Sequence, residues 1–459
     1  MGNNKRRKGQ VDESATKSTN AASKSSNLNQ KNSNVDQNQM NSGFGYYRDR
    51  LLEDAFNLIK WVILAVAVGL VVGAASSLFA KVLSAVTNFR AANGWVFYLM
   101  PVAGLCIVFL YDKIGREDRG TVQVFSTVRA KDDVLLRSAP LIFISTSLTH
   151  LTGGSAGREG AAIQLGGSIG NQLGRWIRLD EEDRHVMVMC GMGAAFAAMF
   201  GTPMAAAIFS MEVISVGTMY YTALAPCVIS AIVASQFAAN VGIHAEAFAV
   251  AGIPELTALS GIKLGLVAIG CAAAGTLFCI VLKTTGKLYG QYFKNKYVKV
   301  VAASCLIIVI TKLLNTTDYM GAGTGLIERA VEHGEADWYA FLVKLVLTAL
   351  TMKAGFKGGE IVPSFCIGAT LGCVLGQLLG ISPSLCAACG MVAVFCSVTN
   401  CPLTSALIAF EMFGFEGAAF YLIAVSISYA TSGYYGLYKD QKIVYSKYKA
   451  KFVNQSTRM

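Results

Sequence analysis

Charged side chains are scarce in this sequence. Only 15% of its 459 residues are Asp, Glu, Lys or Arg, whereas 54% are hydrophobic, and the mean hydropathy is +0.49. Soluble globular proteins carry about 25% charged residues. The shortage of charge therefore excludes a soluble multidomain enzyme and indicates a polytopic membrane protein.

Histidine is scarcer still, and the residue types that bind metals lack ligand spacing. The four histidines form no His-x-x-x-His pair, which weighs against an intramembrane metalloprotease; they are His150, His185, His244 and His333. Cys386 and Cys389 form a Cys-x-x-Cys without a second ligand pair, inside "SLCAACGMVAVF", which predicts one buried helix. We therefore expect no metal and no other cofactor, and an interfacial or hydrogen-bonded role for His150.

The first residues differ in composition from the rest of the chain. They are rich in Asn, Ser, Gln and Lys and predict a disordered cytoplasmic tail over residues 1–50. Trp61 to Ala80 then lacks any charge over about 20 residues, enough to cross a hydrocarbon core about 30 Å thick. Basic residues near both ends place both termini in the cytoplasm: Lys5, Arg6, Arg7, Lys8, Lys442, Lys447, Lys449 and Lys451. The net charge of +11 then reflects orientation and anionic lipid, and we expect no nucleic-acid partner.

Two segments of the chain repeat one pattern. "GMGAAFAAMFGTPMAAAIFSMEV" begins at Gly191 and is echoed in register by "GMVAVFCSVTNCPLTSALIAFEMF", which begins at Gly390. Upstream glycines also align, with Gly166, Gly170 and Gly174 matching Gly368, Gly372 and Gly376. The repetition predicts two homologous transmembrane halves, residues 51–250 and 251–438, before a C-terminal helix and short cytoplasmic tail, residues 439–459.

Each half contains a glycine-rich break in an apolar run. In "GGSAGREGAAIQLGGSIG", from Gly153 to Gly170, a helix that restarts near Arg158 leaves its first N–H groups unpaired. At membrane depth such groups are tolerated only where they line a cavity, and they attract anions. "GFKGGEIVPSF" repeats the pattern around Glu360 in the second half. We expect the two helix starts to share one anion near the membrane midplane.

Glu159 is placed to compete with that anion. As a carboxylate it can occupy the site, and when protonated or displaced it leaves, which couples protons to anions. Other interpretations stay open, with Glu159 as a structural partner of Arg158 and Glu360 as a helix cap. For Glu212 and Glu411, at matching helix ends of the repeat, we favour a structural role.

These motifs resemble those of the CLC family of chloride channels and anion/proton antiporters. "GREG" at Gly157 to Gly160, followed by "GGSIG", and Gly-x-x-x-Pro at Gly359 to Pro363 are similar to the family's filter motifs. "GFKGGE" followed by proline is similar to its fluoride/proton antiporter clade. The resemblance covers about Leu52 to Phe452. It implies an all-α polytopic homodimer with one pore per subunit, built from two inverted-topology halves whose broken helices meet at a midplane anion site.

The resemblance also implies roles for individual residues. Glu159 matches the gating glutamate, and Tyr445 in "KIVYSKY" falls where the family has its pore tyrosine. Together with this tyrosine, the expected anion-binding residues are those of the two motifs: Gly157, Arg158, Gly160, Gly359, Ile361 and Val362.

Two departures from the family pattern affect the interpretation. Chloride/proton exchangers carry paired glutamates where this chain has Glu212 followed by Val213, so the usual internal proton acceptor is missing. The fluoride clade, which this chain resembles, also lacks this internal acceptor and uses the glutamate of its "GGE" stretch instead. The resemblance therefore implies that Glu360 couples protons.

The second departure is the first filter segment, "DRGTVQVF" from Asp118 to Phe125. It has neither the Gly-Ser-Gly-Ile-Pro of typical members nor the methionine-containing form of many fluoride exporters. We expect Thr121 or Val122 to face the anion.

The sequence thus predicts a multi-pass antiporter of the cell (inner) membrane that exports fluoride in exchange for protons, with the lipid bilayer as its surroundings. A chloride/proton exchanger or a passive voltage-gated-type chloride channel of the same family is the alternative. An intramembrane enzyme is a remote one, because the chain offers neither a nucleophile with a base nor a metal set.

Overall fold

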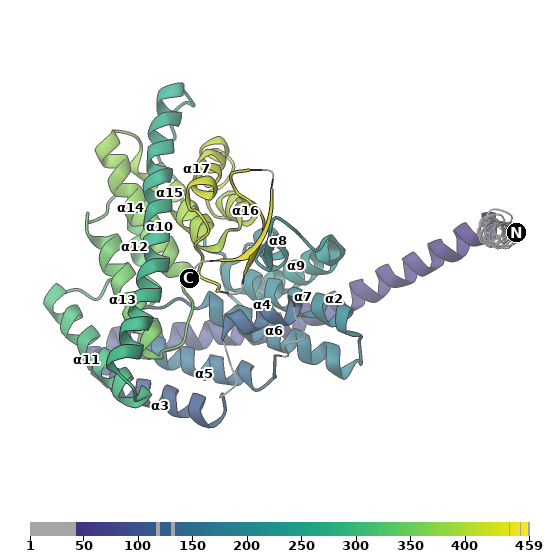
Figure 1. Cartoon of the computed structure of the whole chain (residues 1–459), viewed down its shortest axis with the longest axis horizontal. Coiled ribbons are helices and arrows are strands. Elements are labelled where there is room, and N and C mark those ends of the chain that lie inside the picture. Colours follow the sequence, from purple (N-terminus) through teal and green to yellow (C-terminus); the bar gives the residue numbers. More distant parts are fainter. Residues whose placement is uncertain (1–42, 116–119, 130–133, 440, 450, 458–459) are drawn as a thin grey trace, which may run out of the picture. The chain divides into compact units, whose positions relative to one another are not determined.

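The structure, a computed structural model, describes residues 43–115, 120–129, 134–439, 441–449 and 451–457 (Figure 1). Most of the predicted tail, residues 1–42, lies outside the described residues, and so do Asp118 and Arg119 of the first filter segment. The chain divides into two compact units, Met1–Trp61 and Val62–Met459, and the candidate site belongs to the second.

Helices make up most of the described chain. Those in the first half of the sequence are α2 (Gly43–Ala92), η1 (Gly94–Leu99), α3 (Met100–Lys113), α4 (Thr121–Arg129), α5 (Ser138–Leu151), α6 (Glu159–Trp176), α7 (Glu181–Phe200), α8 (Pro203–Glu212), η2 (Tyr221–Ala223) and α9 (Leu224–Asn240). Those in the second half are α10 (Ala258–Tyr292), α11 (Lys296–Leu314), α12 (Thr324–Glu332), α13 (Ala340–Ala354), α14 (Ile361–Leu379), α15 (Pro383–Thr399), α16 (Pro402–Phe413) and α17 (Ala418–Thr431).

Several of these helices are long and apolar enough to cross a membrane. Among the described residues there are six such segments: Arg50–Ala92, Gly94–Lys113, Tyr221–Asn240, Ala258–Tyr292, Lys296–Leu314 and Ile361–Leu379. Large apolar side chains on α10 are exposed, including Leu259, Ile262 and Leu266. Such a surface is unfavourable in water and suits contact with lipid. The chain is therefore a multi-pass membrane protein.

The repeated glycines lie where two helices of each half touch. In the contact of α6 with α7, a Cβ atom on Gly166 would lie 2.2 Å from the carbonyl oxygen of Gly191. In the contact of α14 with α15, a Cβ atom on Gly368 would lie 2.3 Å from the carbonyl oxygen of Gly390. Only glycine permits this close backbone approach. The sequence repeat thus corresponds to the same helix pair, formed twice.

The helix break inside each repeat is also the same. α7 ends before Gly201 and α15 before Asn400, and both residues adopt the left-handed conformation that terminates helices. α8 and α16 then begin with proline, which suits a first turn because that position has no intrahelical N–H partner to lose. The segment "SLCAACGMVAVF" lies within α15 and is buried, which confirms the prediction of one buried helix.

A small sheet corrects two predictions. It pairs β1 (Ser215–Val216) in parallel with β2 (Lys442–Tyr445), which pairs antiparallel with β3 (Phe452–Ser456). The prediction of a helix within residues 439–459 is wrong, because "KIVY" and "FVNQS" carry β-branched and aromatic residues and β3 alternates in exposure with the period of a strand. The fold is therefore mostly helical and not all-α.

Candidate functional site

The two glycine-rich breaks face each other in the structure. α6 begins at Glu159 and α14 at Ile361, which confirms that helices restart after the glycines. The Gly157 N–H donates to the Gly359 carbonyl oxygen at 2.7 Å, and the Gly359 N–H donates to the Gly157 carbonyl oxygen at 2.8 Å. This reciprocal pair satisfies loop backbone that lipid could not satisfy, and it joins the two helix starts.

Both helix starts offer free backbone donors. Among the described residues, the N–H groups of Gly160 and Ala161 in α6 and of Ile361 and Val362 in α14 have no backbone acceptor. A first helical turn has no internal acceptor for these groups, and the helix dipole adds partial positive charge there. Two such starts held together form a site suited to a small anion.

Close backbone contact between the two starts explains the glycine at position 359. A Cβ atom on Gly359 would lie 2.6 Å from the Gly160 nitrogen, inside any allowed contact distance. A side chain at this position would separate α6 from α14.

The Glu159 side chain folds back onto the start of its own helix. It is fully buried, and its Oε2 accepts a hydrogen bond from the Arg158 backbone N–H at 2.9 Å. A Cβ atom on Gly157 would lie 2.6 Å from this oxygen, so glycine there makes room for the carboxylate. Oε1 has no hydrogen-bond partner among the described residues, and its ion-pair contact is the Arg158 Nε at 3.4 Å. Buried carboxylate oxygens normally have hydrogen-bond partners, so Glu159 has fewer stabilising contacts than is usual for a buried carboxylate.

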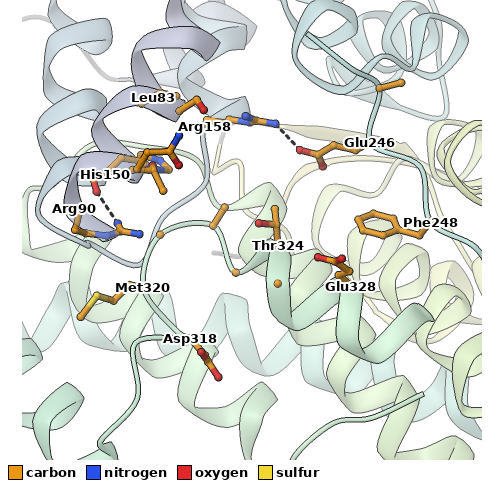
Figure 2. A pocket seen from close by; sticks show the side chains of 18 of the residues that line it. Leu83, Arg90, His150, Arg158, Glu246, Phe248, Asp318, Met320, Thr324 and Glu328 are labelled. Atoms are coloured by element: carbon orange, nitrogen blue, oxygen red, sulfur yellow. Dashed lines mark hydrogen bonds and ion pairs between the residues drawn. The ribbon is translucent and has the colours of Figure 1, made fainter. Parts of the chain in front are cut away.

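Arg158 has a second acidic partner that the sequence interpretation missed. Its guanidinium forms a hydrogen-bonded ion pair with Glu246, in the segment between α9 and α10, and Figure 2 shows the two groups directed at each other. Glu246 stands alone in the sequence between apolar residues, so no local pattern indicates the pairing. Arg158 is therefore shared between Glu159 and Glu246.

Glu360 occupies the N-cap position of α14 without acting as a side-chain cap. Its carboxyl makes no capping hydrogen bond, which weakens the helix-cap interpretation. The charges of Lys353 and Lys357 act on it. It also interacts electrostatically with Tyr438, and the same phenol interacts with Glu159. The charges of both carboxyl groups therefore act on Tyr438.

The first filter segment contributes Thr121 to the site. Thr121 begins α4, and its hydroxyl donates to the Gly160 carbonyl oxygen at 3.1 Å. Val122 follows in the same turn and is partly buried. The Thr121 hydroxyl therefore contacts the start of α6.

Comparison with known proteins identifies the family. The pattern of the family described as "Voltage gated chloride channel" matches residues 103–433 of this chain. The chain belongs to this family. CLC proteins are ion-transport proteins and not enzymes, which excludes the intramembrane enzyme considered from the sequence.

Several CLC relatives are similar over most of this chain. A chloride/fluoride channel protein of Pseudomonas syringae pv. tomato is 36% identical over 399 residues, which cover 85% of this chain and 88% of the relative. The crystal structure of a CLC-type fluoride/proton antiporter matches with a TM-score of 0.79 and 34% identity, covering 83% of this chain and 98% of that one. A slow cyanobacterial Cl⁻/H⁺ antiporter matches in fold alone, with a TM-score of 0.71 at 18% identity over 81% of this chain and 94% of that one.

Tyr445, the expected pore tyrosine, and Tyr438 differ in burial. Tyr445 lies in β2, where its ring is 50% exposed and packs against Phe452. Tyr438 is buried and packs edge to face on Phe125 of α4, with 4.7 Å between the ring centroids. Both tyrosines precede the end of the chain, and burial, which the sequence alone does not give, distinguishes them.

His150 is buried beside the filter loop and not at an interface. Its Nε2 lies 3.3 Å from the Gly157 carbonyl oxygen, so it is a hydrogen-bonded histidine. Within the described ranges, no cluster of three or more His, Cys, Asp or Glu residues is arranged to hold a metal ion.

Proposed function

We propose that this CLC protein is an antiporter that exports fluoride in exchange for protons, with one anion path in each subunit of a homodimer. Its substrate is inferred from two relatives, the Pseudomonas chloride/fluoride channel protein and the solved CLC-type fluoride/proton antiporter. The observation that carries the proposal is the buried Glu159 carboxylate, which lies over the start of α6 where an anion would bind.

In this proposal, the Glu159 carboxylate and the transported anion compete for one site. Two negative charges 4 Å apart repel by about 4 kcal/mol at an effective dielectric constant of about 20, so the site holds one of them at a time. Protonation removes the charge of the carboxyl group, which then leaves the helix start to the anion. The unsatisfied Oε1 supports this exchange, because the carboxylate has one hydrogen bond, to the Arg158 N–H, and its other oxygen has only the ion-pair contact with Arg158 among the described residues.

Glu360 is the proposed second proton carrier. The family's usual internal acid is replaced by Val213, so protons need another carboxyl group on their way to Glu159. Glu360 has no capping bond to lose and interacts with Tyr438, which also interacts with Glu159. A proton path from Glu360 past the Tyr438 hydroxyl to Glu159 fits this arrangement.

The anion is proposed to bind the backbone of the two helix starts. Its ligands would come from the two motifs and α4: Gly157, Arg158, Gly160, Gly359, Ile361, Val362 and Thr121. Fluoride is smaller and more strongly hydrated than chloride, so selectivity for it requires close, hard N–H donors to replace its water. The free amides of α6 and α14 are donors of that kind.

We further propose inverted topology for the two halves, residues 51–250 and 251–438. The reciprocal bonds between Gly157 and Gly359 and the repeated glycine contacts of α6 with α7 and α14 with α15 are what a twofold relation between the halves would produce. Both termini are proposed to lie on the cytoplasmic side of the cell (inner) membrane, because basic residues gather near both ends.

A passive anion channel is the second candidate, since the Pseudomonas relative carries the name of a channel. The presence of two carboxyl groups, Glu159 and Glu360, whose charges both act on Tyr438 favours an exchanger, because a channel does not need a proton carrier.

Purified protein in liposomes loaded with equal fluoride and chloride provides the test. We expect fluoride to leave faster than chloride and the outside pH to rise as protons enter the vesicles. Fluoride efflux without a change in external pH would indicate a channel, and chloride efflux as fast as fluoride efflux would contradict the substrate assignment. Empty liposomes with a proton ionophore provide the control for passive leak.

A further inference from the structure

A polar pocket lies beside the loop that precedes α6, residues 152–158, and outside the two helix starts. Its volume is about 560 Å³, and its lining includes Arg90, His150, Arg158, Gly321 and Gly323. Figure 2 shows Arg90 and His150 on one side of this pocket and Glu328 and Phe248 on the other. The space is many times the roughly 30 Å³ of one water molecule, so an ion inside it keeps part of its hydration shell.

Basic groups surround the loop at Gly321. A Cβ atom on Gly321 would lie 3.7 Å from both Nη1 and Nη2 of Arg90 and 4.0 Å from Nδ1 of His150. The Gly321 carbonyl oxygen accepts from the Lys344 ammonium at 2.7 Å. Because Gly321 has no side chain, its backbone forms one wall of the pocket. Arg90 and Lys344 lie close to this backbone.

Lys344 is fully buried under this loop. Its ammonium donates to the carbonyl oxygens of Tyr319 at 3.1 Å and Gly321 at 2.7 Å. It also lies 3.1 Å from the position that a Cβ atom on Gly323 would take. Because Gly323 adds no side chain, only the loop backbone separates the Lys344 charge from the pocket.

In the part of the chain that the structure describes, Arg90 and Lys344 have no carboxylate partner, and Arg90 donates instead to the His150 carbonyl oxygen at 2.7 Å. Of the acids that line the pocket, Glu246 pairs with Arg158 and Asp318 pairs with Arg329 at 2.7 Å.

Glu328 is the remaining acid of the pocket, and it is exposed at the side opposite Arg90. Lys344 is buried and Arg90 is half-buried, and cations without counter-ions at such positions are costly in a membrane protein unless an anion binds near them.

We propose that this pocket is a second anion site, which binds a hydrated halide between Arg90 and the Gly321–Gly323 loop and loads the path to Glu159. Arg158, the residue next to Glu159, lines the pocket. An anion bound in the pocket would therefore lie close to the Glu159 carboxylate. A concave basic site raises the local concentration of the anion. The loading role rests on the proposed function, whereas the binding site itself does not.

Bromide provides the direct test, because its anomalous scattering locates it in crystals of the full protein. The pocket leaves the ion hydrated, so we expect it to accept bromide even if the helix starts select fluoride. An anomalous peak beside the Arg90 guanidinium should appear in the wild type, weaken or vanish in Arg90→Gln, and remain in Lys81→Gln. Lys81 is an exposed residue of the same helix α2, so the control removes the same charge elsewhere. An empty wild-type pocket at saturating bromide would overturn the proposal, whatever the variants do.

Transport kinetics provide the second arm. Removal of one nearby charge should raise the fluoride concentration for half-maximal efflux by about fivefold or more in Arg90→Gln, with the maximal rate within about twofold of wild type. Glu328→Gln removes a charge of opposite sign and should lower that concentration. Equal bromide occupancy in Arg90→Gln and wild type would overturn the role of Arg90. Failure of proton coupling in the wild type would overturn the proposed function and leave the bromide result intact.

Discussion

Glu212 and Glu411 cap each other's helices. Glu212 ends α8, and its carboxylate accepts from the backbone N–H of Thr404 at 2.8 Å and from its hydroxyl at 2.6 Å, in the first turn of α16. Glu411 lies near the end of α16, and its carboxylate accepts from the N–H of Ala205 at 2.8 Å in the first turn of α8. Such an exchange requires antiparallel helices, as inverted halves would supply, and it supports the structural role that the sequence pattern favours for both acids.

Glu212→Gln should destabilise the protein without uncoupling it. The amide nitrogen cannot accept the hydrogen bonds that Glu212 takes from α16, and the loss of charge weakens the cap, so we expect unfolding to become easier by about 1–3 kcal/mol. Thermal unfolding in detergent measures the change, and Glu416→Gln, which alters an exposed acid, is the matched control. A Glu212→Gln protein of wild-type stability that no longer moves protons would show that this carboxylate carries them.

Glu360→Gln should have the opposite profile. Because Glu360 makes no capping hydrogen bond, we expect the free energy of unfolding to change by less than in Glu212→Gln. Loss of its ionisable group should stop proton uptake in the liposome assay while the protein elutes at the wild-type position. Proton uptake at the wild-type ratio to fluoride would assign Glu360 to the structure of α14 alone.

Tyr438→Phe and Tyr445→Phe form a matched pair of variants. Each removes one hydroxyl, but Tyr438 is buried and subject to the charges of Glu159 and Glu360, whereas Tyr445 is half exposed. A hydrogen bond to a charged group contributes about 1.5–3 kcal/mol, so we expect Tyr438→Phe to slow fluoride efflux by about tenfold or more. Tyr445→Phe should leave efflux unchanged. The reverse ranking in the same efflux assay would restore Tyr445 as the pore tyrosine.

The parts of the site that depend on neighbouring residues, namely the two helix starts, could be predicted from the sequence. Glycines before Glu159 and Glu360 indicate broken helices because a helix start needs flexible backbone ahead of it, and both starts lie where the glycines place them. The repeat predicted two homologous halves, and its glycines lie at the equivalent contacts of α6 with α7 and of α14 with α15. The identity of the family came from those same motifs.

Features that depend on residues far apart in the sequence escaped prediction. The pairing of Arg158 with Glu246 joins positions with no common pattern, and nothing in the sequence around Tyr438 marks it as buried while Tyr445 is exposed. The residues of β2 and β3 favour strands, but the pairing of β2 with β1, more than 220 positions earlier in the chain, follows no local pattern.

Glu159→Gln and Glu159→Ala should separate the two proposed roles of Glu159, which are to carry protons and to block the anion site. Glutamine has the shape of the protonated acid and cannot titrate, so we expect proton movement to stop. Alanine empties the start of α6, so we expect passive fluoride flow without protons. In the wild type, rising pH keeps the carboxylate ionised and in the site, so fluoride efflux should slow as pH rises. In Glu159→Ala, fluoride efflux measured with a fluoride electrode over the same pH series should not change.

A Glu159→Gln protein that still takes up protons at the wild-type ratio would assign proton coupling to another residue. The two helix starts joined by the reciprocal bonds of Gly157 and Gly359 would then serve anion binding alone.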